Sequence, residues 1–158
     1  MIFATVGTQA PFDRFIRMLD ELADGVHEDI IAQTFNGEYI PKNIQTVGFI
    51  PPDEFSDYFN RARLIIAHAG MGTILSALTQ QKPIIVVPRL ASLGEHRNDH
   101  QMATAMRLNE LGYVYVAYDK KQLKDLLLSK DLKPLKQIGS SASRSLIDSI
   151  SDFINNGI

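Results

Sequence analysis

The sequence of 158 residues contains no cysteine, so disulfide bonds and thiolate metal sites are excluded. It also lacks an excess of charge of one sign. There are 16 Lys and Arg residues against 18 Asp and Glu residues, the formal net charge is −2, and no basic stripe is present. Binding to nucleic acid depends on clustered positive charge. We therefore expect no nucleic-acid partner.

Long hydrophobic runs are absent as well. No apolar run approaches the ~20 residues that a membrane-spanning helix requires. The apolar run at residues 2–6 has no basic residue before it, so it predicts a buried strand rather than a signal peptide. We expect a cytoplasmic protein, with any recruitment to the inner face of a membrane made through a partner.

Short apolar runs alternate with stretches of helical periodicity along the chain. The runs at 64–67 and 84–87 show no polar alternation, which indicates strands buried on both faces, as in a parallel sheet. The length suits one domain over residues 1–158. The order of elements predicts an α/β fold, namely a single doubly wound, mostly parallel sheet with right-handed crossovers.

The other elements are predicted from apolar spacing and from turn residues. We expect strands at 2–6, 29–34, 44–47 and 113–117, and helices from Pro11 to Gly25, after a cap at Asp53, and at 73–81, 98–111, 120–128 and about 143–155. In a doubly wound sheet the ligand lies at the carboxyl ends of the strands. Three loops at such ends should therefore matter: 7–9, 68–73 and 88–101.

The sharpest motif is the turn HAGMGT at residues 68–73, which joins a strand to a helix. Gly70 and Gly72 leave the backbone open to close approach. The helix that follows presents free N–H groups and the positive end of its dipole, and Thr73 adds a hydroxyl. This assembly suits a phosphate or diphosphate, although an empty turn is an equally good interpretation.

Other glycine motifs match poorly. The dinucleotide pattern would need glycine where Leu75 stands, and no G-K-[ST] sequence occurs, so an NAD enzyme and an ATPase are disfavoured. No G-x-S-x-G elbow or other nucleophile-and-base arrangement is present.

A polar segment, GEHRNDHQ at residues 94–101, is the second feature. His96 and His100 are four residues apart and could share a helix face as metal ligands do, but no third ligand is evident. A helix start capped by Asn98 or Asp99 is the simpler interpretation. A site for sugar hydroxyls is the intermediate one.

Three weaker signals are found at the ends of strands. The Gly7-Thr8-Gln9 turn and the Phe49-Ile50-Pro51 segment each read, alone, as an ordinary loop. Arg89 follows a strand and could meet a phosphate or a sugar carboxylate, and a surface ion pair is an equally good interpretation.

Taken in order, the segments at 7–9, 49–51, 68–73, 88–89 and 95–101 resemble the carboxyl-terminal domain of family 28 glycosyltransferases. The match runs to about residue 117. Within the family the chain is similar to short stand-alone catalytic subunits, such as the E-type subunits of bacterial polysaccharide transferases and the catalytic half of the split eukaryotic UDP-GlcNAc transferase. The resemblance implies the Rossmann-like donor-binding half of a GT-B glycosyltransferase.

The resemblance also implies roles for residues. It places the uracil at Ile50, the diphosphate on residues 70–73 with help from the 7–9 loop, and the sugar hydroxyls at His100 and Gln101. Family members commonly hold the ribose with a carboxylate one turn into the helix, where this chain has Ser76.

The residues expected to bind the UDP-sugar are Gly7, Thr8, Gln9, Phe49, Ile50, His68, Gly70, Met71, Gly72, Thr73, Ser76, Arg89, Glu95, Asn98, His100 and Gln101. No residue is assigned as a catalytic acid or base. Gly70, Gly72 and Thr73 would stabilise the leaving diphosphate, since preorganised donors at a developing charge are usually the largest catalytic term. The resemblance therefore implies neither a cofactor nor a bound metal.

The implied function is that of the catalytic subunit of a two-component inverting transferase. It would move a hexose from a UDP-sugar to a lipid-linked saccharide acceptor in surface polysaccharide synthesis. Full-length relatives carry the acceptor-binding half and the usual general base in a domain that this chain lacks, so we expect a membrane-anchored partner subunit. An apolar stripe could dock that partner or pack on the sheet of this chain: Leu146, Ile150, Phe153 and Ile154.

Two alternative functions remain open. The chain could be a non-catalytic nucleotide-sugar-binding or scaffolding subunit that modulates a partner transferase, and Ser76 in place of the carboxylate favours this. A sugar-nucleotide epimerase is the weaker alternative, because epimerases of this architecture normally carry both domains in one chain.

Overall fold

The computed structural model describes residues 1–129, 131–136, 138 and 148. The helix expected at about 143–155, with its candidate docking stripe, lies outside the described residues apart from Asp148. No helix in the described ranges is both long and apolar enough to cross a membrane.

The sheet has six strands in the order β3-β2-β1-β4-β5-β6, and every neighbouring pair is parallel. The strands are β1 (Ile2–Thr5), β2 (Ile30–Gln33), β3 (Gln45–Val47), β4 (Leu64–Ala67), β5 (Ile84–Val86) and β6 (Tyr115–Val116). This confirms the doubly wound sheet, and the order is that of the dinucleotide-binding Rossmann fold.

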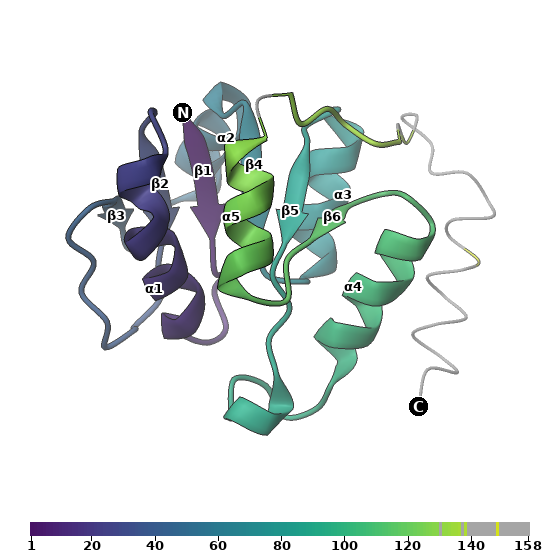
Figure 1. Ribbon diagram of the computed structural model, residues 1–158, viewed down its shortest axis with the longest axis horizontal. Helices are drawn as coiled ribbons and strands as arrows, with labels where there is room; N and C mark the ends of the chain where they lie inside the picture. Colours follow the sequence, from purple (N-terminus) through teal and green to yellow (C-terminus); the bar gives the residue numbers. More distant parts are fainter. Residues whose placement is uncertain (130, 137, 139–147, 149–158) are drawn as a thin grey trace.

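Helices cover both faces of the sheet (Figure 1). The α-helices are α1 (Asp13–Leu22), α2 (Pro52–Arg61), α3 (Met71–Thr79), α4 (His100–Glu110) and α5 (Lys120–Leu128), and short 3₁₀ turns form η1 (Ala23–Gly25) and η2 (Ala91–Leu93). Helices α1 and α5 pack on one face, while α2, α3 and α4 pack on the other.

The central strand β1 is buried on both faces, which explains why residues 2–4 are all apolar. Ile2 and Ala4 point into the cluster under α1 and α5, and Phe3 points into the other cluster. There the Phe3 ring lies 5.4 Å from the Phe55 ring and 5.6 Å from the Tyr58 ring. Burial of each large apolar side chain contributes about 1.5–3 kcal/mol, so both faces stabilise this strand.

Several expected helix bounds differ from the structure. The helix expected from Pro11 to Gly25 is α1 at Asp13–Leu22, followed by the 3₁₀ turn at Ala23–Gly25. Asp53 does not cap α2, because Pro51 is the N-cap and Pro52 is the first helical residue, a position that tolerates the missing N–H. Helix α3 begins at Met71 rather than at residue 73, with Gly70 as its N-cap. The backbone N–H groups of the glycine turn therefore belong to the helix itself.

The expected helix at 98–111 also begins later, at His100. Asp99 is the N-cap without a side-chain capping bond, and Asn98 Oδ1 instead accepts a hydrogen bond from the His100 N–H at 3.2 Å. Gly112, with φ +71°, follows the end of this helix as expected.

Strand register brings the three candidate loops together. Thr5 is opposite Ala67 across β1 and β4, and Ala67 is opposite Val86 across β4 and β5. The loops that follow these strands therefore leave from the same edge of the sheet, to which the arrowheads of β1 and β5 point (Figure 1). The strand order reverses between β1 and β4, so the switch point lies between the 7–9 loop and the glycine turn.

Candidate functional site

A cavity of about 600 Å³ opens at this switch point. Its volume lies within the roughly 300–1,000 Å³ that is usual for small-molecule sites. The expected binding residues that line it are Gly7, Thr8, Gln9, Ile50, His68, Gly70, Met71, Gly72, Thr73, Ser76, Arg89 and Gln101. The structure thus gathers three loops and the start of α3 around one space.

The start of α3 forms one wall of this cavity. Met71, Gly72 and Thr73 are its first three residues, and N–H groups in the first turn of a helix have no partner within the helix. The first turn contains no acidic residue, so the positive end of the helix dipole is not neutralised there. The wall therefore presents backbone donors and partial positive charge.

The His68 ring lies between Gly7 and Gly70. A Cβ atom added to Gly7 would lie 2.6 Å from His68 Nε2, and one added to Gly70 would clash with the same ring. Gly7 also has φ +77°, which L side chains rarely adopt. Both glycines are thus needed to admit the imidazole, a reason that the sequence did not reveal. At Gly72, by contrast, a Cβ would meet nothing within 4 Å.

His68 is held in its neutral form. Burial lowers the pKa of its imidazole from 6.5 to about 4, and the positive charge of Arg89 acts in the same direction. At neutral pH the ring is therefore uncharged and has one N–H to donate.

Arg89 is 3% exposed, and it binds the backbone rather than the surface. Its guanidinium donates to the carbonyl oxygens of Val6 at 2.9 Å, Ala10 at 2.7 Å and Pro11, and lies 4.5 Å from the centre of the Phe12 ring. Arg89 therefore does not form the surface ion pair that the sequence also allowed. Because it lines the cavity, its contact with a phosphate or a sugar carboxylate stays a prediction. It holds the 7–9 loop in place and puts a buried positive charge at the wall of the cavity.

Four expected residues do not line the cavity: Phe49, Glu95, Asn98 and His100. The Glu95 carboxylate instead accepts hydrogen bonds from Arg14 at 2.7 Å and from the Leu90 N–H at 2.9 Å, which ties the loop after β5 to α1. Phe49 is 73% exposed. The structure therefore does not bring His100 to the place that the resemblance implied for sugar hydroxyls.

Sequence reasoning missed two buried polar side chains at the ends of β1 and β2. Gln33 is 2% exposed, and its Oε1 accepts from Thr5 Oγ1 at 2.6 Å. Thr5 Oγ1 in turn accepts from the Gly7 N–H at 3.1 Å. The pair fixes the start of the 7–9 loop. The available signal was a polar residue at the carboxyl end of each apolar strand.

His96 also lines the cavity, from the loop before α4. Its Nδ1 contacts the Asn98 backbone oxygen at 3.1 Å and Asn98 Oδ1 at 3.0 Å. Within the described ranges, no group of three or more His, Cys, Asp or Glu side chains is arranged to hold a metal ion.

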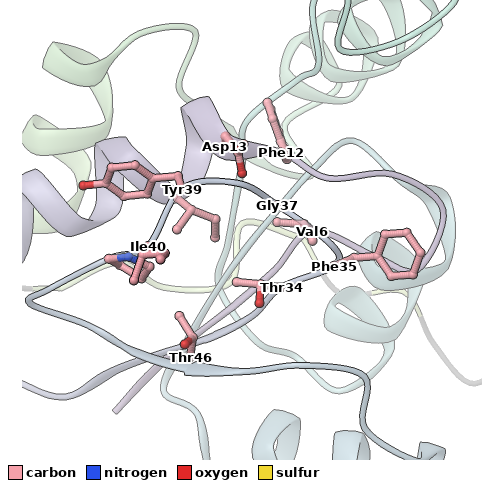
Figure 2. Close-up of a pocket in the computed structure, with 11 residues that line it drawn as sticks. Val6, Phe12, Asp13, Thr34, Phe35, Gly37, Tyr39, Ile40 and Thr46 are labelled. Atoms are coloured by element: carbon pink, nitrogen blue, oxygen red, sulfur yellow. The ribbon is translucent and has the colours of Figure 1, made fainter.

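A smaller recess of about 130 Å³ lies beside α1, between Phe12, Tyr39 and Ile40 (Figure 2). It is below the usual size range for ligand sites. Its lining mixes apolar side chains with Asp13, Thr34 and Thr46, and Ile40 is 82% exposed. The larger cavity is therefore the candidate site.

Comparison with known sequences gives related proteins. The chain is 28% identical over 127 residues to the UDP-N-acetylglucosamine transferase subunit ALG13 of Mus musculus, which covers 72% of this chain and 10% of the mouse protein. It is 44% identical over 54 residues to the same subunit of Eremothecium gossypii, 34% of this chain and 25% of that protein. The match to the mouse relative thus spans about a tenth of that relative's length.

Solved structures share the fold. The NMR solution structure of ALG13 matches with a TM-score of 0.58 and 23% identity over 85% of this chain and 88% of that one. MurG of Acinetobacter baumannii matches with a TM-score of 0.60 and 18% identity over 95% of this chain and 49% of that one.

The model of the glycosyltransferase family 28 C-terminal domain matches residues 1–155. The match includes all six strands of the sheet and every loop that lines the cavity. The chain therefore belongs to the family of the glycosyltransferase family 28 C-terminal domain.

Proposed function

We propose that the chain is the catalytic, donor-binding subunit of a two-component inverting glycosyltransferase that uses a UDP-sugar. The observation that carries this is the start of α3, which opens without an acidic neighbour onto a cavity of about 600 Å³ at the switch point. The described residues that line the cavity include no Asp or Glu but do include Arg89. Such a site favours a polyanion.

The diphosphate would lie on the first turn of α3. The N–H groups of Met71, Gly72 and Thr73, with the Thr73 hydroxyl, would donate to its oxygens. When the bond between sugar C1 and the β-phosphate oxygen breaks, negative charge grows on that oxygen, and fixed donors stabilise it. With Arg89 they supply positive charge, so we propose that the reaction needs no metal.

The nucleoside would extend toward Ile50 and Ser76, which both line the cavity. The Ser76 hydroxyl donates its proton to the Gly72 carbonyl oxygen at 3.0 Å. Its lone pairs remain free to accept a hydrogen bond from a ribose hydroxyl. Ser76 would thus replace the carboxylate of other family members as an acceptor.

Inversion requires an acceptor hydroxyl to attack C1 from the face opposite the leaving UDP, while a base takes the hydroxyl proton. No carboxylate among the described cavity residues can be this base, and the lowered pKa of His68 makes it a weak one. We propose that a membrane-anchored partner subunit supplies the base and binds a lipid-linked saccharide. The relatives are named as subunits, which supports a heteromer.

In this proposal the chain is cytoplasmic, is recruited to the membrane by its partner, and acts in surface polysaccharide synthesis. The sugar is a hexose or, as in the names of the relatives, N-acetylglucosamine. Titration calorimetry with uridine, UDP, UDP-glucose and UDP-N-acetylglucosamine tests the donor site. UDP should bind much more tightly than uridine, and equal affinity for the two would refute a diphosphate site.

A non-catalytic, scaffolding subunit remains the alternative, favoured by Ser76. Co-expression with the acceptor-binding partner separates the two. Transfer of labelled sugar from the UDP-sugar to the lipid-linked acceptor should require Thr73 in this chain. Full transfer by a complex that carries Thr73→Val, with UDP binding lost, would favour the scaffold.

A further inference from the structure

Gln101 joins two loops that border the cavity. It is the second residue of α4, and its Oε1 accepts a hydrogen bond from the Arg89 N–H at 3.1 Å. Its Nε2 lies 3.1 Å from His68 Nδ1. One amide group thus bridges the loop after β5 and the turn after β4, and both distances lie in the normal range for hydrogen bonds.

The chemistry of these atoms fixes the direction of each bond. A backbone N–H only donates, so the amide atom that faces Arg89 is the oxygen. The atom facing His68 is then the NH₂ group, which also only donates. His68 Nδ1 must therefore accept, and the proton of the neutral ring resides on Nε2.

The position of the ring gives this tautomer a consequence. Nε2 is the atom nearest to the place where a Gly7 side chain would begin, and His68 lines the cavity. Within the described part of the chain no hydrogen bond from Nε2 is found, whereas Nδ1 is paired with Gln101. The Nε2–H is thus the donor that the ring offers beside the start of α3.

The charged surroundings of the ring keep it neutral. The groups that face it are Arg89 from the loop after β5 and His96 from the loop before α4, and both disfavour a second proton. With burial they lower the pKa of His68 to about 4. Between pH 6 and 8 the tautomer, rather than the charge, therefore decides what His68 presents.

We propose that Gln101 is a positioning residue that holds His68 in the Nε2–H tautomer, so that the ring presents a donor rather than a lone pair to the anion bound at α3. The part concerning the anion rests on the proposed donor site. In this role Gln101 acts through His68, which differs from the direct sugar contact implied by the family resemblance.

Long-range ¹H–¹⁵N spectra of the imidazoles test the tautomer without any ligand. The wild-type protein should show His68 protonated at Nε2 from pH 8 to below pH 6. Gln101→Glu replaces the donating NH₂ by an acceptor, so His68 should gain a proton at Nδ1, and its pKa should rise. Gln101→Met removes both bonds, and a mixture of tautomers is expected. Asn109→Met, an amide removed from the exposed side of α4, is the matched control and should change nothing.

The affinity for UDP between pH 6.5 and 8.5 gives the second readout. It is expressed as the ratio of the variant Kd to the wild-type Kd, because protonation of the UDP phosphate affects both proteins equally. The ratio for Gln101→Glu should be at least about tenfold at pH 8.5, from the loss of one hydrogen bond to a charged group together with repulsion by the new carboxylate. It should fall toward one as the pH drops and the ring takes a second proton.

Protonation of wild-type His68 at Nδ1, or an unchanged tautomer in both Gln101 variants, would overturn the assignment of Gln101. If the tautomers behave as described but wild-type protein does not bind UDP, the assignment of Gln101 stands and the proposed donor function fails.

Discussion

The imidazole of His68 occupies the space into which a side chain at Gly7 would extend, since a Cβ there would lie 2.6 Å from His68 Nε2. The loops after β1 and β4 can thus pack closely because Gly7 has no side chain and leaves room for the His68 ring. Arg89 completes the arrangement by binding the carbonyl oxygens of the first loop. The geometry of the candidate site depends on these contacts as well as on its exposed residues.

Gly7→Ala should destabilise the protein by about 1–3 kcal/mol, because Ala is strained at φ +77° and its Cβ meets the His68 ring. Urea unfolding measures the change. Gly25→Ala is the control, since a Cβ there meets nothing within 4 Å, and it should be neutral or slightly stabilising. Equal stability of the two variants would show that the packing of His68 against Gly7 is not required.

Arg89→Met should cost about 3–5 kcal/mol, because three backbone carbonyl groups lose their charged donor. Thermal and urea unfolding test this. Arg61→Met removes an exposed arginine that pairs with Asp57 on the same helix, and it should cost less than about 1 kcal/mol. A comparably small effect at Arg89 would mean that water replaces its hydrogen bonds and that it does not hold the loop.

The free energy of unfolding should decrease as the pH is lowered, and part of this decrease should come from His68. The pKa of about 4 for His68 in the folded protein lies below the ordinary value of 6.5 for histidine, so the unfolded chain binds more protons between these values. Stability is therefore full above pH 6.5 and falls as the pH drops toward 4, by at most about 3 kcal/mol from this group. The free energy of unfolding of wild-type and His68→Asn protein should converge over this interval. Parallel pH profiles would contradict the burial of a neutral imidazole.

Much of the fold could be predicted because its signals are local. The uninterrupted apolar runs at β4 and β5 indicated a parallel sheet, and strand order then placed the loops 7–9 and 68–73 at one edge. The start of α3 was misplaced by two residues because glycine at Gly70 and Gly72 suggested a turn, whereas the helix already includes Gly72.

The roles of single side chains were harder to predict, since they depend on contacts far apart in sequence. Arg89 binds the backbone of Val6, and no local sequence pattern near either residue predicts that contact. His100 and Gln101 are neighbours, yet successive residues on a helix point about 100° apart, so Gln101 lines the cavity and His100 does not. The sequence pair His100-Gln101 therefore does not act as one binding unit in the folded helix.

The most direct test of a diphosphate on the first turn of α3 is the affinity of Gly72→Leu for UDP, measured by titration calorimetry. A Cβ at this exposed glycine meets nothing within 4 Å, and leucine is a better helix former, so the fold should be retained or slightly stabilised. Gly25→Leu serves as the control. The account predicts that Kd for UDP rises at least tenfold in Gly72→Leu, a loss of about 1.4 kcal/mol or more, and stays unchanged in the control. Wild-type affinity in a folded Gly72→Leu protein would contradict it.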